Sequence, residues 1–485
     1  MKKINIFNLS ILGYLYLPIV LFLITWLNPI IGLPLVLVIC YIVLRYSFQK
    51  SEMNISLKKD WLFLLVALLI IVLWALLSGL GGFFLQSYDW QKHNVLLNDF
   101  INKNWPVHYK FNGKYGVVSY YIGEYIIPGM IGKVCGFNVA QTSLLVWIIL
   151  GLFLLIISLY KWVNKQNGYL FLLIVFALIL FSPFIYPLNG IYGNWVPWDY
   201  NTMGEMGEWF SKSLKLQYTS NISLLRFVFP QFVPVALSVS LWLRNRKNYQ
   251  FWGLILAPII LYSTFAFIGL AVLMLFILIY DCFDKKNAVD WKKVFNIVNI
   301  LSLLLMIVLL LYISCNIFQP KPVDEKMKFT FIDVWSHKLG FITLQASWLI
   351  WVLLLLKHEW KNPLIYASSI ILFLLPFCEY GAANDLVMRV SIPALMVINF
   401  LVIKNIANYW KKDLYFALVL FGALFIAGIG PLWQLKNASL SQNFPSRVYN
   451  MPYKTGDEFF KSDKNVVYQY VDWSQNTLRK IIIRK

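Results

Sequence analysis

The sequence predicts an all-α polytopic membrane protein. Of its 485 residues, 60% are hydrophobic and only 13% are charged, a composition typical of membrane proteins. Apolar runs of helix length recur along the whole chain, whereas a transmembrane β-barrel would show short segments of alternating hydrophobicity. No long polar domain interrupts these runs before residue 430, so the membrane part dominates the fold.

Thirteen apolar runs are long enough to be read as helices crossing the roughly 30 Å hydrocarbon core of a bilayer. They cover 11–27, 30–46, 62–86, 144–160, 169–187, 230–243, 251–264, 266–280, 294–317, 341–356, 363–377, 391–403 and 413–429. The second run follows the first at once, with no A-x-A-like cleavage site between them, which predicts a retained helix rather than a signal peptide. The runs on either side of Ser263 form either a short hairpin or one long tilted span.

Basic residues indicate which way these helices face. With the N-terminus in the cytoplasm, 20 of the 42 Lys and Arg residues fall in short inner loops, at more than twice their density in the outer segments. This is the positive-inside pattern. One span at 251–280 would turn the basic residues of 285–293 outward, so the pattern favours the hairpin. The C-terminus then lies outside, and the lysine-, asparagine- and isoleucine-rich composition indicates a bacterial cytoplasmic membrane.

Acidic residues are distributed in the opposite way. Seven of the 22 lie in inner loops and 22 − 7 = 15 lie outside, with none in the middle of a predicted span. An ion-coupled transporter usually carries an ionisable group at membrane depth, so this class is disfavoured. Any chemistry is expected on the outer face.

The chain divides into three predicted parts. They are an N-terminal helical hairpin with a basic cytoplasmic loop (1–60), the main transmembrane module (61–429) and an extracytoplasmic tail (430–485). The outer segments of the module are 87–143, 188–228, 319–340 and 378–390. In the first of these, amphipathic helices at 95–101 and 120–134 are expected to lie on the membrane, and the tail carries a strand-like patch at 466–471.

Asp89 opens the first outer segment, directly beyond a membrane helix. A carboxylate there can accept a proton from an attacking hydroxyl or bind a metal ion. His93 follows four residues later, so on a helix the two side chains would share one face, and either could act as a base or a phosphate ligand. A solvated helix end, with Trp90 as an interfacial anchor, also explains these residues.

Arg389 lies at the outer lip of the predicted span 391–403. A lone arginine on this side has no positive-inside explanation, and its planar fork suits a phosphate or a carboxylate. An ion pair with Asp385, one helical turn away, is the alternative, and both roles are compatible.

Other polar and aromatic residues of the outer segments suit a sugar pocket. Tryptophans beside acids can stack on sugar rings, although Trp and Tyr are enriched at every membrane interface. Amides and hydroxyls at 217–221 and 230–231 would line a pocket or cap helices. The candidate substrate-binding residues are Lys92, Asn94, Asp99, Trp195, Trp198, Asp199, Tyr218, Asn221, Arg226, Gln231, Glu379, Asn384, Asp385 and Arg389.

Several classes of function are disfavoured. The formal net charge of +20 comes with no nucleic-acid-binding pattern, and it fits basic membrane loops and an anionic lipid substrate. The five cysteines are scattered and the four histidines are too few for a multi-histidine metal centre, so neither a disulfide framework nor a zinc site follows. The sequence contains no Walker A loop, dinucleotide-binding glycine fingerprint, G-x-S-x-G or H-E-x-x-H motif.

The chain resembles the GT-C superfamily of integral membrane glycosyltransferases over roughly residues 61–485. The resemblance rests on Asp89 directly after a membrane helix, the interfacial helices expected in the first large outer loop, the many spans and the outward tail. The runs 89–94 and 384–389 are also similar to those of bacterial GT-C-like proteins linked to surface polysaccharide synthesis.

This resemblance implies transfer of a sugar from a polyprenyl-phosphate donor to a cell-envelope glycan or lipid acceptor on the outer face, with inversion at the anomeric carbon. Asp89 would be the general base, with His93 assisting. Arg389, with Lys92 or Arg226, would neutralise the leaving phosphate. In a bacterium the carrier would be undecaprenyl phosphate.

One cofactor question and two other functions stay open at this point. A divalent cation is not required by the sequence, because Asp89 has no neighbouring acid before Asp99. A polysaccharide polymerase or ligase would share the lipid-linked substrate, but the segment 319–340 carries lysines and no arginine. A flippase or lipid-linked sugar transporter would need polar residues along the midplane, where few are found.

Overall fold

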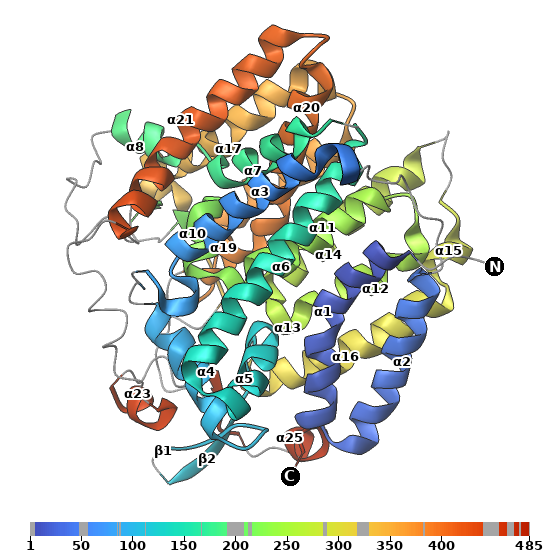
Figure 1. Cartoon of the computed structure of the whole chain (residues 1–485), viewed down its shortest axis with the longest axis vertical. Coiled ribbons are helices and arrows are strands. Elements are labelled where there is room, and N and C mark those ends of the chain that lie inside the picture. The colour runs from blue at the N-terminus through green and yellow to red at the C-terminus, as the bar shows by residue number, and fades with distance from the viewer. Residues whose placement is uncertain are drawn as a thin grey trace.

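Long apolar helices make up most of the protein (Figure 1). The computed structural model describes residues 5–47, 57–84, 86, 89–111, 113–165, 167–191, 208–211, 216–284, 289–317, 329–381, 384–439, 455–462, 470–474 and 477–484. Within these residues, nine helices are long and apolar enough to cross a membrane. They are α1 (Ile6–Thr25), α2 (Pro29–Ser47), α3 (Leu57–Leu77), α6 (Phe137–Val163), α14 (Thr264–Phe283), α16 (Ile297–Ile317), α17 (Lys338–Glu359), α20 (Ile392–Tyr409) continued from α19 (Asp385–Val390), and α21 (Leu414–Ser439). The expected multi-pass helical class is confirmed.

The count of thirteen spans is not confirmed, because the other four predicted runs form shorter helices. These are α7 (Tyr169–Leu180), α11 (Phe229–Arg244), α12 (Trp252–Leu256) with α13 (Ile259–Tyr262), and α18 (Pro363–Leu374). The predicted span 169–187 is interrupted because Phe181 turns extended just before Ser182-Pro183. Proline disfavours a helical conformation in the residue before it, so the chain restarts as a separate helix, α8 (Ile185–Ile191).

The first outer segment begins earlier than the apolar run 62–86 predicts. Helix α3 ends at Leu77, and Gly79 takes a left-handed conformation with φ 92°. Glycine adopts this conformation without strain and commonly follows a helix end. A short 3-10 turn, η1 (Leu80–Gly82), then carries the chain to Asp89.

The two apolar runs around Ser263 form a hairpin, as the charge pattern favours. Ser263 is extended, with φ −170° and ψ 107°, and its side chain accepts a hydrogen bond from Ala266 N at the start of α14. The far ends of the hairpin meet, because the hydroxyl of Tyr249 donates to Asp281 Oδ2 over 2.8 Å. The chain therefore reverses direction at Ser263.

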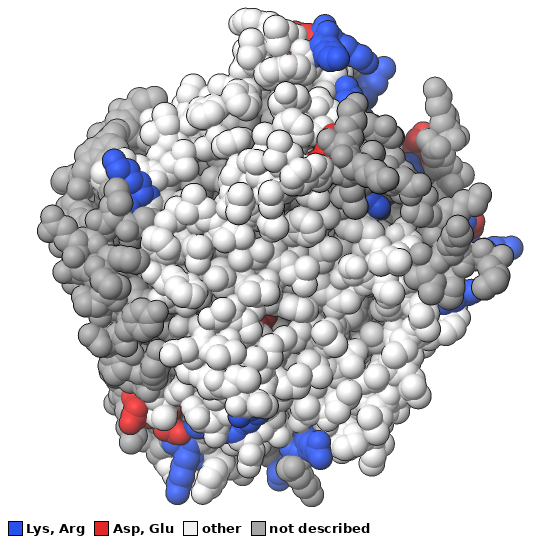
Figure 2. All heavy atoms as spheres, viewed as in Figure 1, with Lys and Arg blue, Asp and Glu red and all other residues white. Residues whose placement is uncertain are grey.

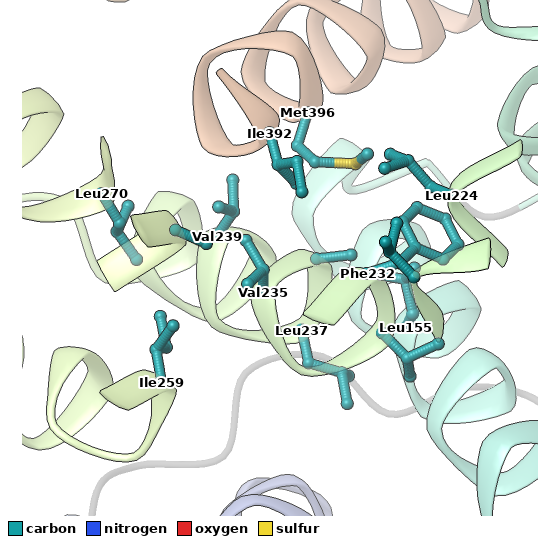
Figure 3. Close-up of a cluster of buried hydrophobic side chains, with 14 of the residues drawn as sticks. Leu155, Leu224, Phe232, Val235, Leu237, Val239, Ile259, Leu270, Ile392 and Met396 are labelled. Atoms are coloured by element: carbon teal, nitrogen blue, oxygen red, sulfur yellow. The ribbon is translucent and has the colours of Figure 1, made fainter. Parts of the chain in front are cut away.

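Helix α11 occupies the centre of the bundle. Every residue from Phe229 to Leu243 is buried, and α6, α13, α14 and α20 all contact this helix. Figure 3 shows the resulting cluster, in which Phe232, Val235 and Val239 of α11 lie among side chains such as Leu155 and Ile392. Inside a membrane such packing is driven by van der Waals contact rather than by exclusion of water.

Between α3 and α6, two helices flank a β-hairpin that the sequence interpretation treated only as a break. The helices are α4 (Trp90–Asn102) and α5 (Gly123–Cys135), close to the predicted 95–101 and 120–134. The strands β1 (His108–Phe111) and β2 (Lys114–Val118) are antiparallel, and Gly113 in their turn has φ 76°. A third strand from the tail, β7 (Val471–Asp472), pairs with β2, so the tail does contain a strand near the predicted patch at 466–471.

The remaining elements are short. They are η2 (Tyr249–Phe251), α10 (Asn221–Phe227), α15 (Trp291–Val294), η4 (Val334–His337), η5 (Leu375–Phe377), α23 (Gly456–Ser462), α25 (Thr477–Ile482), and the strand pairs β3 (Trp209–Ser211) with β4 (Leu216–Gln217) and β5 (Thr330–Phe331) with β6 (Cys378–Glu379).

The N-terminal helix and the end of the tail define two opposite ends of the bundle. Asn28 N, just beyond α1, donates to Ile482 O over 2.8 Å, so the tail end lies at the far end of α1 from its N-terminus. On the face in Figure 2, the visible charged side chains lie around the edges, mostly at the upper right, along the right edge and along the lower margin, with one basic group at the left, and the described surface between them is almost entirely uncharged. An uncharged band of this kind fits a lipid bilayer.

Candidate active site

Helix α4 places Asp89 and His93 at the end of the bundle that carries the tail. A chain of amides fixes this helix. Gln141 donates to Asn94 over 2.9 Å, Asn94 donates to Gln86 over 2.8 Å, and Gln86 donates to the carbonyl of Gly79 over 2.9 Å. Asn94 therefore connects α4 to α6 and to the end of α3.

Asp89 lies at the N-terminus of α4 and does not cap it through its side chain. Its Oδ1 is 3.2 Å from Lys92 Nζ, and the two side chains are 37% and 25% exposed. Burial alone would lower the pKa of Lys92, but Asp89, with a smaller contribution from Asp385, raises it overall. Lys92 therefore stays protonated and holds the Asp89 carboxylate in place.

His93 has a partner at each ring nitrogen. Nε2 is 3.1 Å from the carbonyl of Phe227, which can only accept, so this nitrogen carries the proton. Nδ1 then accepts a hydrogen bond from the hydroxyl of Tyr125. Burial lowers the pKa of His93 to about 4, the charges of Lys92 and Arg389 act in the same direction, and Asp89 opposes them. A neutral imidazole held at both nitrogens favours a positioning role over the predicted role as an assisting base.

Arg389 and Asp385 form the predicted ion pair one helical turn apart. Arg389 Nη2 is 2.9 Å from Asp385 Oδ1, and the two side chains are 11% and 14% exposed. The guanidinium lies over the ring of Tyr121, 5.9 Å from its centroid. Arg389 Nε is buried and has no hydrogen-bond partner among the described residues. A buried N–H without an acceptor is costly, so this donor suits an anionic ligand.

The fold brings these two groups together although about three hundred residues separate them in the sequence. Asp89, Lys92 and Arg389 all act electrostatically on His93, and Asp385 acts on Lys92. Two carboxylates and two cations thus share one partly exposed cluster. We call Asp89, Lys92, Asp385 and Arg389 the charged cluster.

Other predicted site residues are used inside the fold. Asp99 is buried and accepts hydrogen bonds from Tyr109 Oη over 2.7 Å and Gly456 N over 2.9 Å, so it anchors the tail. Tyr218 donates to the carbonyl of Leu372. Two further amides lie at helix contacts: Asn221 donates to Leu178 O over 2.8 Å, and Gln231 accepts from Ser263 over 3.0 Å.

The structure describes three of the remaining predicted residues, Arg226, Asn384 and Glu379, and does not describe the other three. Arg226 is buried at the end of α10, where its carbonyl accepts a hydrogen bond from Trp90 Nε1 over 3.0 Å. Asn384 is buried with φ 49° and precedes α19, and Glu379 pairs with Thr330 between β6 and β5. Trp195, Trp198 and Asp199 lie outside the described residues.

Two buried carboxyl groups and a set of tyrosines are not among the predicted site residues. Glu208 accepts hydrogen bonds from Ser220 and Ser223, and Glu124 accepts one from Tyr14 over 3.1 Å. Burial raises the pKa of Glu208 to about 7 and that of Glu124 to about 8. The helix containing Glu124 packs against the middle of α1 rather than lying on the membrane surface alone.

Tyrosines line one side of the charged cluster. Tyr120, Tyr121 and Tyr470 all act electrostatically on the Arg389 guanidinium. Tyr120 and Tyr121 are adjacent in the first outer segment, and this pair could have been noted in the sequence as a candidate for the site. No sequence pattern links the pair to Tyr470 in the tail.

The described residues contain no group of three or more His, Cys, Asp or Glu side chains arranged to hold a metal ion. No protein-family model, curated protein or solved structure matches this chain, and its function must therefore be inferred from the geometry of the site itself.

Proposed function

We propose that the protein is a membrane glycosyltransferase of the GT-C type. It would transfer a sugar from a polyprenyl-phosphate donor to a cell-envelope acceptor, at the end of the bundle that carries the tail. The observation that supports this proposal is that the Asp89–Lys92 pair and the Asp385–Arg389 pair both lie near His93. A partly exposed carboxylate in the same region as a buried guanidinium offers a base and an anion ligand next to apolar helices.

In the proposed reaction, Asp89 is the general base. The acceptor hydroxyl attacks the anomeric carbon of the donor, its proton passes to the Asp89 carboxylate, and the bond to the phosphate oxygen breaks with inversion. Lys92 contacts Oδ1, and Oδ2 has no hydrogen-bond partner in the part of the chain that the structure describes. The second oxygen is therefore available to take the proton.

Arg389 is the proposed ligand of the leaving phosphate. Its charge would neutralise the negative charge that develops on the phosphate oxygen as the glycosidic bond breaks. Nε offers a donor in addition to the Nη2 atom that contacts Asp385. Donors fixed before the reaction stabilise developing charge without reorganisation, so the ion pair with Asp385 would help by holding the guanidinium still.

The proposed orientation places the N-terminus in the cytoplasm of a bacterial cell and the charged cluster outside. It rests on the excess of basic residues in the predicted inner loops. The positions of the two chain ends fit it, because the tail end and the start of α1 lie at opposite ends of that helix.

The test is Asp89→Asn in the full-length protein reconstituted in lipid nanodiscs with a panel of synthetic polyprenyl-phosphate sugars. Release of polyprenyl phosphate and transfer to envelope acceptors are measured together. We expect wild-type transfer with at least one donor and a loss of about a hundredfold or more in the variant. Asp290→Asn is the matched control, since Asp290 also precedes a helix and pairs with a lysine three residues later, Lys293, over 3.5 Å. Transfer by Asp89→Asn at the wild-type rate would remove Asp89 from the mechanism.

A further inference from the structure

The tail places Tyr470 near the charged cluster. Strand β7 extends the β1–β2 sheet, and Ser119 N donates to the carbonyl of Tyr470 over 3.0 Å just before that strand. Tyr470 thereby lies beside Tyr120, with ring centroids 4.0 Å apart. Its side chain comes from the far end of the sequence, more than eighty residues beyond Arg389.

Contacts on both sides of Tyr470 fix the tail. Before it, Gly456 N donates to the buried carboxylate of Asp99 over 2.9 Å, and Asp457 pairs with Lys103 over 2.6 Å. After it, Arg484 N donates to the carbonyl of Trp26 over 3.0 Å. The contacts before Tyr470 join the tail to the end of α4 and the contact after it joins the tail to the end of α1, so the position of Tyr470 does not depend on one short strand.

The chemistry of Tyr470 matches that of Arg389. The residue is only 7% exposed, and burial keeps its pKa well above the usual value, so the hydroxyl stays neutral. The hydrogen bond with Tyr120 acts in the same direction, whereas the nearby Arg389 charge opposes it. Neutral hydroxyls beside a guanidinium can accept its N–H groups, or donate to a phosphate oxygen that it binds.

We infer that Tyr470 is a positioning residue for Arg389: its ring packs on Tyr120, Tyr120 packs on Tyr121 with ring centroids 4.6 Å apart, and the Arg389 guanidinium lies over Tyr121, so the three tyrosines hold it for binding a phosphate group. Its consequence for catalysis rests on the proposed glycosyltransferase function. An arginine side chain has several rotatable bonds, and a fixed fork binds phosphate better than a mobile one. The stacked tyrosines support the ring under the guanidinium, and Asp385 holds the guanidinium through the ion pair. Simple packing of the tail would need the ring but not its hydroxyl.

The first experiment compares Tyr470→Phe and Tyr470→Ala with the control Tyr115→Phe, which changes an exposed tyrosine on β2. Transfer kinetics and labelling of Arg389 by phenylglyoxal are measured on the full-length protein in nanodiscs. We expect Tyr470→Phe to lower kcat about two- to tenfold with an unchanged KM for the acceptor, in keeping with one lost hydrogen bond. Tyr470→Ala should lower kcat further and speed the labelling of Arg389 several-fold, because Tyr120 and Tyr121 lose the ring that supports them beside the guanidinium.

Wild-type kcat and wild-type labelling in Tyr470→Ala would overturn the inference. Equal effects of the Phe and Ala variants on labelling, with no effect on kcat, would also overturn it. If the wild-type protein transfers no sugar at all, the glycosyltransferase proposal fails. The labelling of Arg389 would still report whether Tyr470 holds the guanidinium, so the two failures are distinguishable.

The second experiment tests the docked tail directly. Val118 and Val471 are register partners in β2 and β7. Because the adjacent Ser119–Tyr470 pair is hydrogen-bonded, Val118 and Val471 form a non-hydrogen-bonded pair, in which the side chains of the two strands lie closer together. Val118→Cys with Val471→Cys, in a chain lacking its native cysteines, should form a disulfide spontaneously and keep wild-type transfer when oxidised. The offset pair Val117→Cys with Val471→Cys is the control. No cross-link in the register pair would overturn the placement of Tyr470.

Discussion

Glu124 should make the protein less stable as the pH rises. This carboxyl group is fully buried in α5 and accepts a hydrogen bond from Tyr14 of α1. Burial raises its pKa from 4.5 to about 8, outweighing the effect of the Tyr14 hydroxyl. Between these two values the folded protein binds a proton that the unfolded chain has released, so unfolding becomes easier as the pH increases.

The structure gives a magnitude for this effect. A difference of 3.5 pKa units, from 4.5 to 8, corresponds to about 5 kcal/mol of stability lost across the whole window. About 3 kcal/mol of this is lost by pH 7, and nothing further is lost above pH 8. Glu124→Gln cannot ionise and keeps the carbonyl oxygen that accepts from Tyr14, so the variant should be increasingly more stable than wild type from pH 4.5 to pH 8.

Thermal unfolding in nanodiscs at pH 5, 7 and 8.5 tests this expectation. The melting temperature of Glu124→Gln should exceed that of wild type by an amount that grows over this series. The control Glu458→Gln, at an exposed glutamate of α23, should show no such trend. A constant difference, or a variant that is less stable than wild type at pH 8.5, would refute the reasoning about burial.

Three further outcomes are expected. Arg389→Lys should lower kcat/KM about tenfold or more in the transfer assay, because a lysine cannot reproduce the planar fork, and wild-type kinetics would exclude Arg389 as the phosphate ligand. Asp99→Ala should cost about 2 kcal/mol by leaving two buried donors, from Tyr109 and Gly456, without an acceptor, and limited proteolysis should then cut the tail faster. The contribution of His93 to stability should be lost as the pH drops from 6.5 to 4, because the unfolded chain protonates His93 more readily than the folded one, and the melting temperature of wild type relative to His93→Gln should therefore fall over this range.

The helical class was predictable because apolar runs of helix length carry their own signal. The hairpin at Ser263 was predictable from charge, since only a reversal there keeps the basic residues of 285–293 on the inner side. The four shorter helices could not be told apart from the nine longer ones in the sequence, because apolar composition reports burial and not whether lipid or protein provides it. Helix α11 is apolar because protein surrounds it on all sides.

The candidate site was predictable only in part. Asp89 and Arg389 were singled out by their chemical type and position at helix ends, and the fold brings them together. Their common neighbourhood around His93 results from the tertiary fold, which no local pattern encodes. The same limit applies to Asn94 and Asp99. The sequence gives no partner for either side chain, but in the fold Asn94 accepts a hydrogen bond from Gln141 and Asp99 accepts one from Gly456.

The central position of α11 constrains how the protein is made. The helix has only 16 residues, contains Pro234, and carries Gln231 and Ser240, whose partners are Ser263 of the following hairpin and Ser158 of α6. A segment this short, with two polar side chains in it, is expected to insert weakly by itself, because those side chains would meet lipid before their partners arrive. We therefore expect insertion of α11 during synthesis to depend on α6 already being in place and to be completed when α14 follows. The order of the chain supplies the two partners on either side of α11, which favours stepwise assembly of the membrane core over the docking of finished helices.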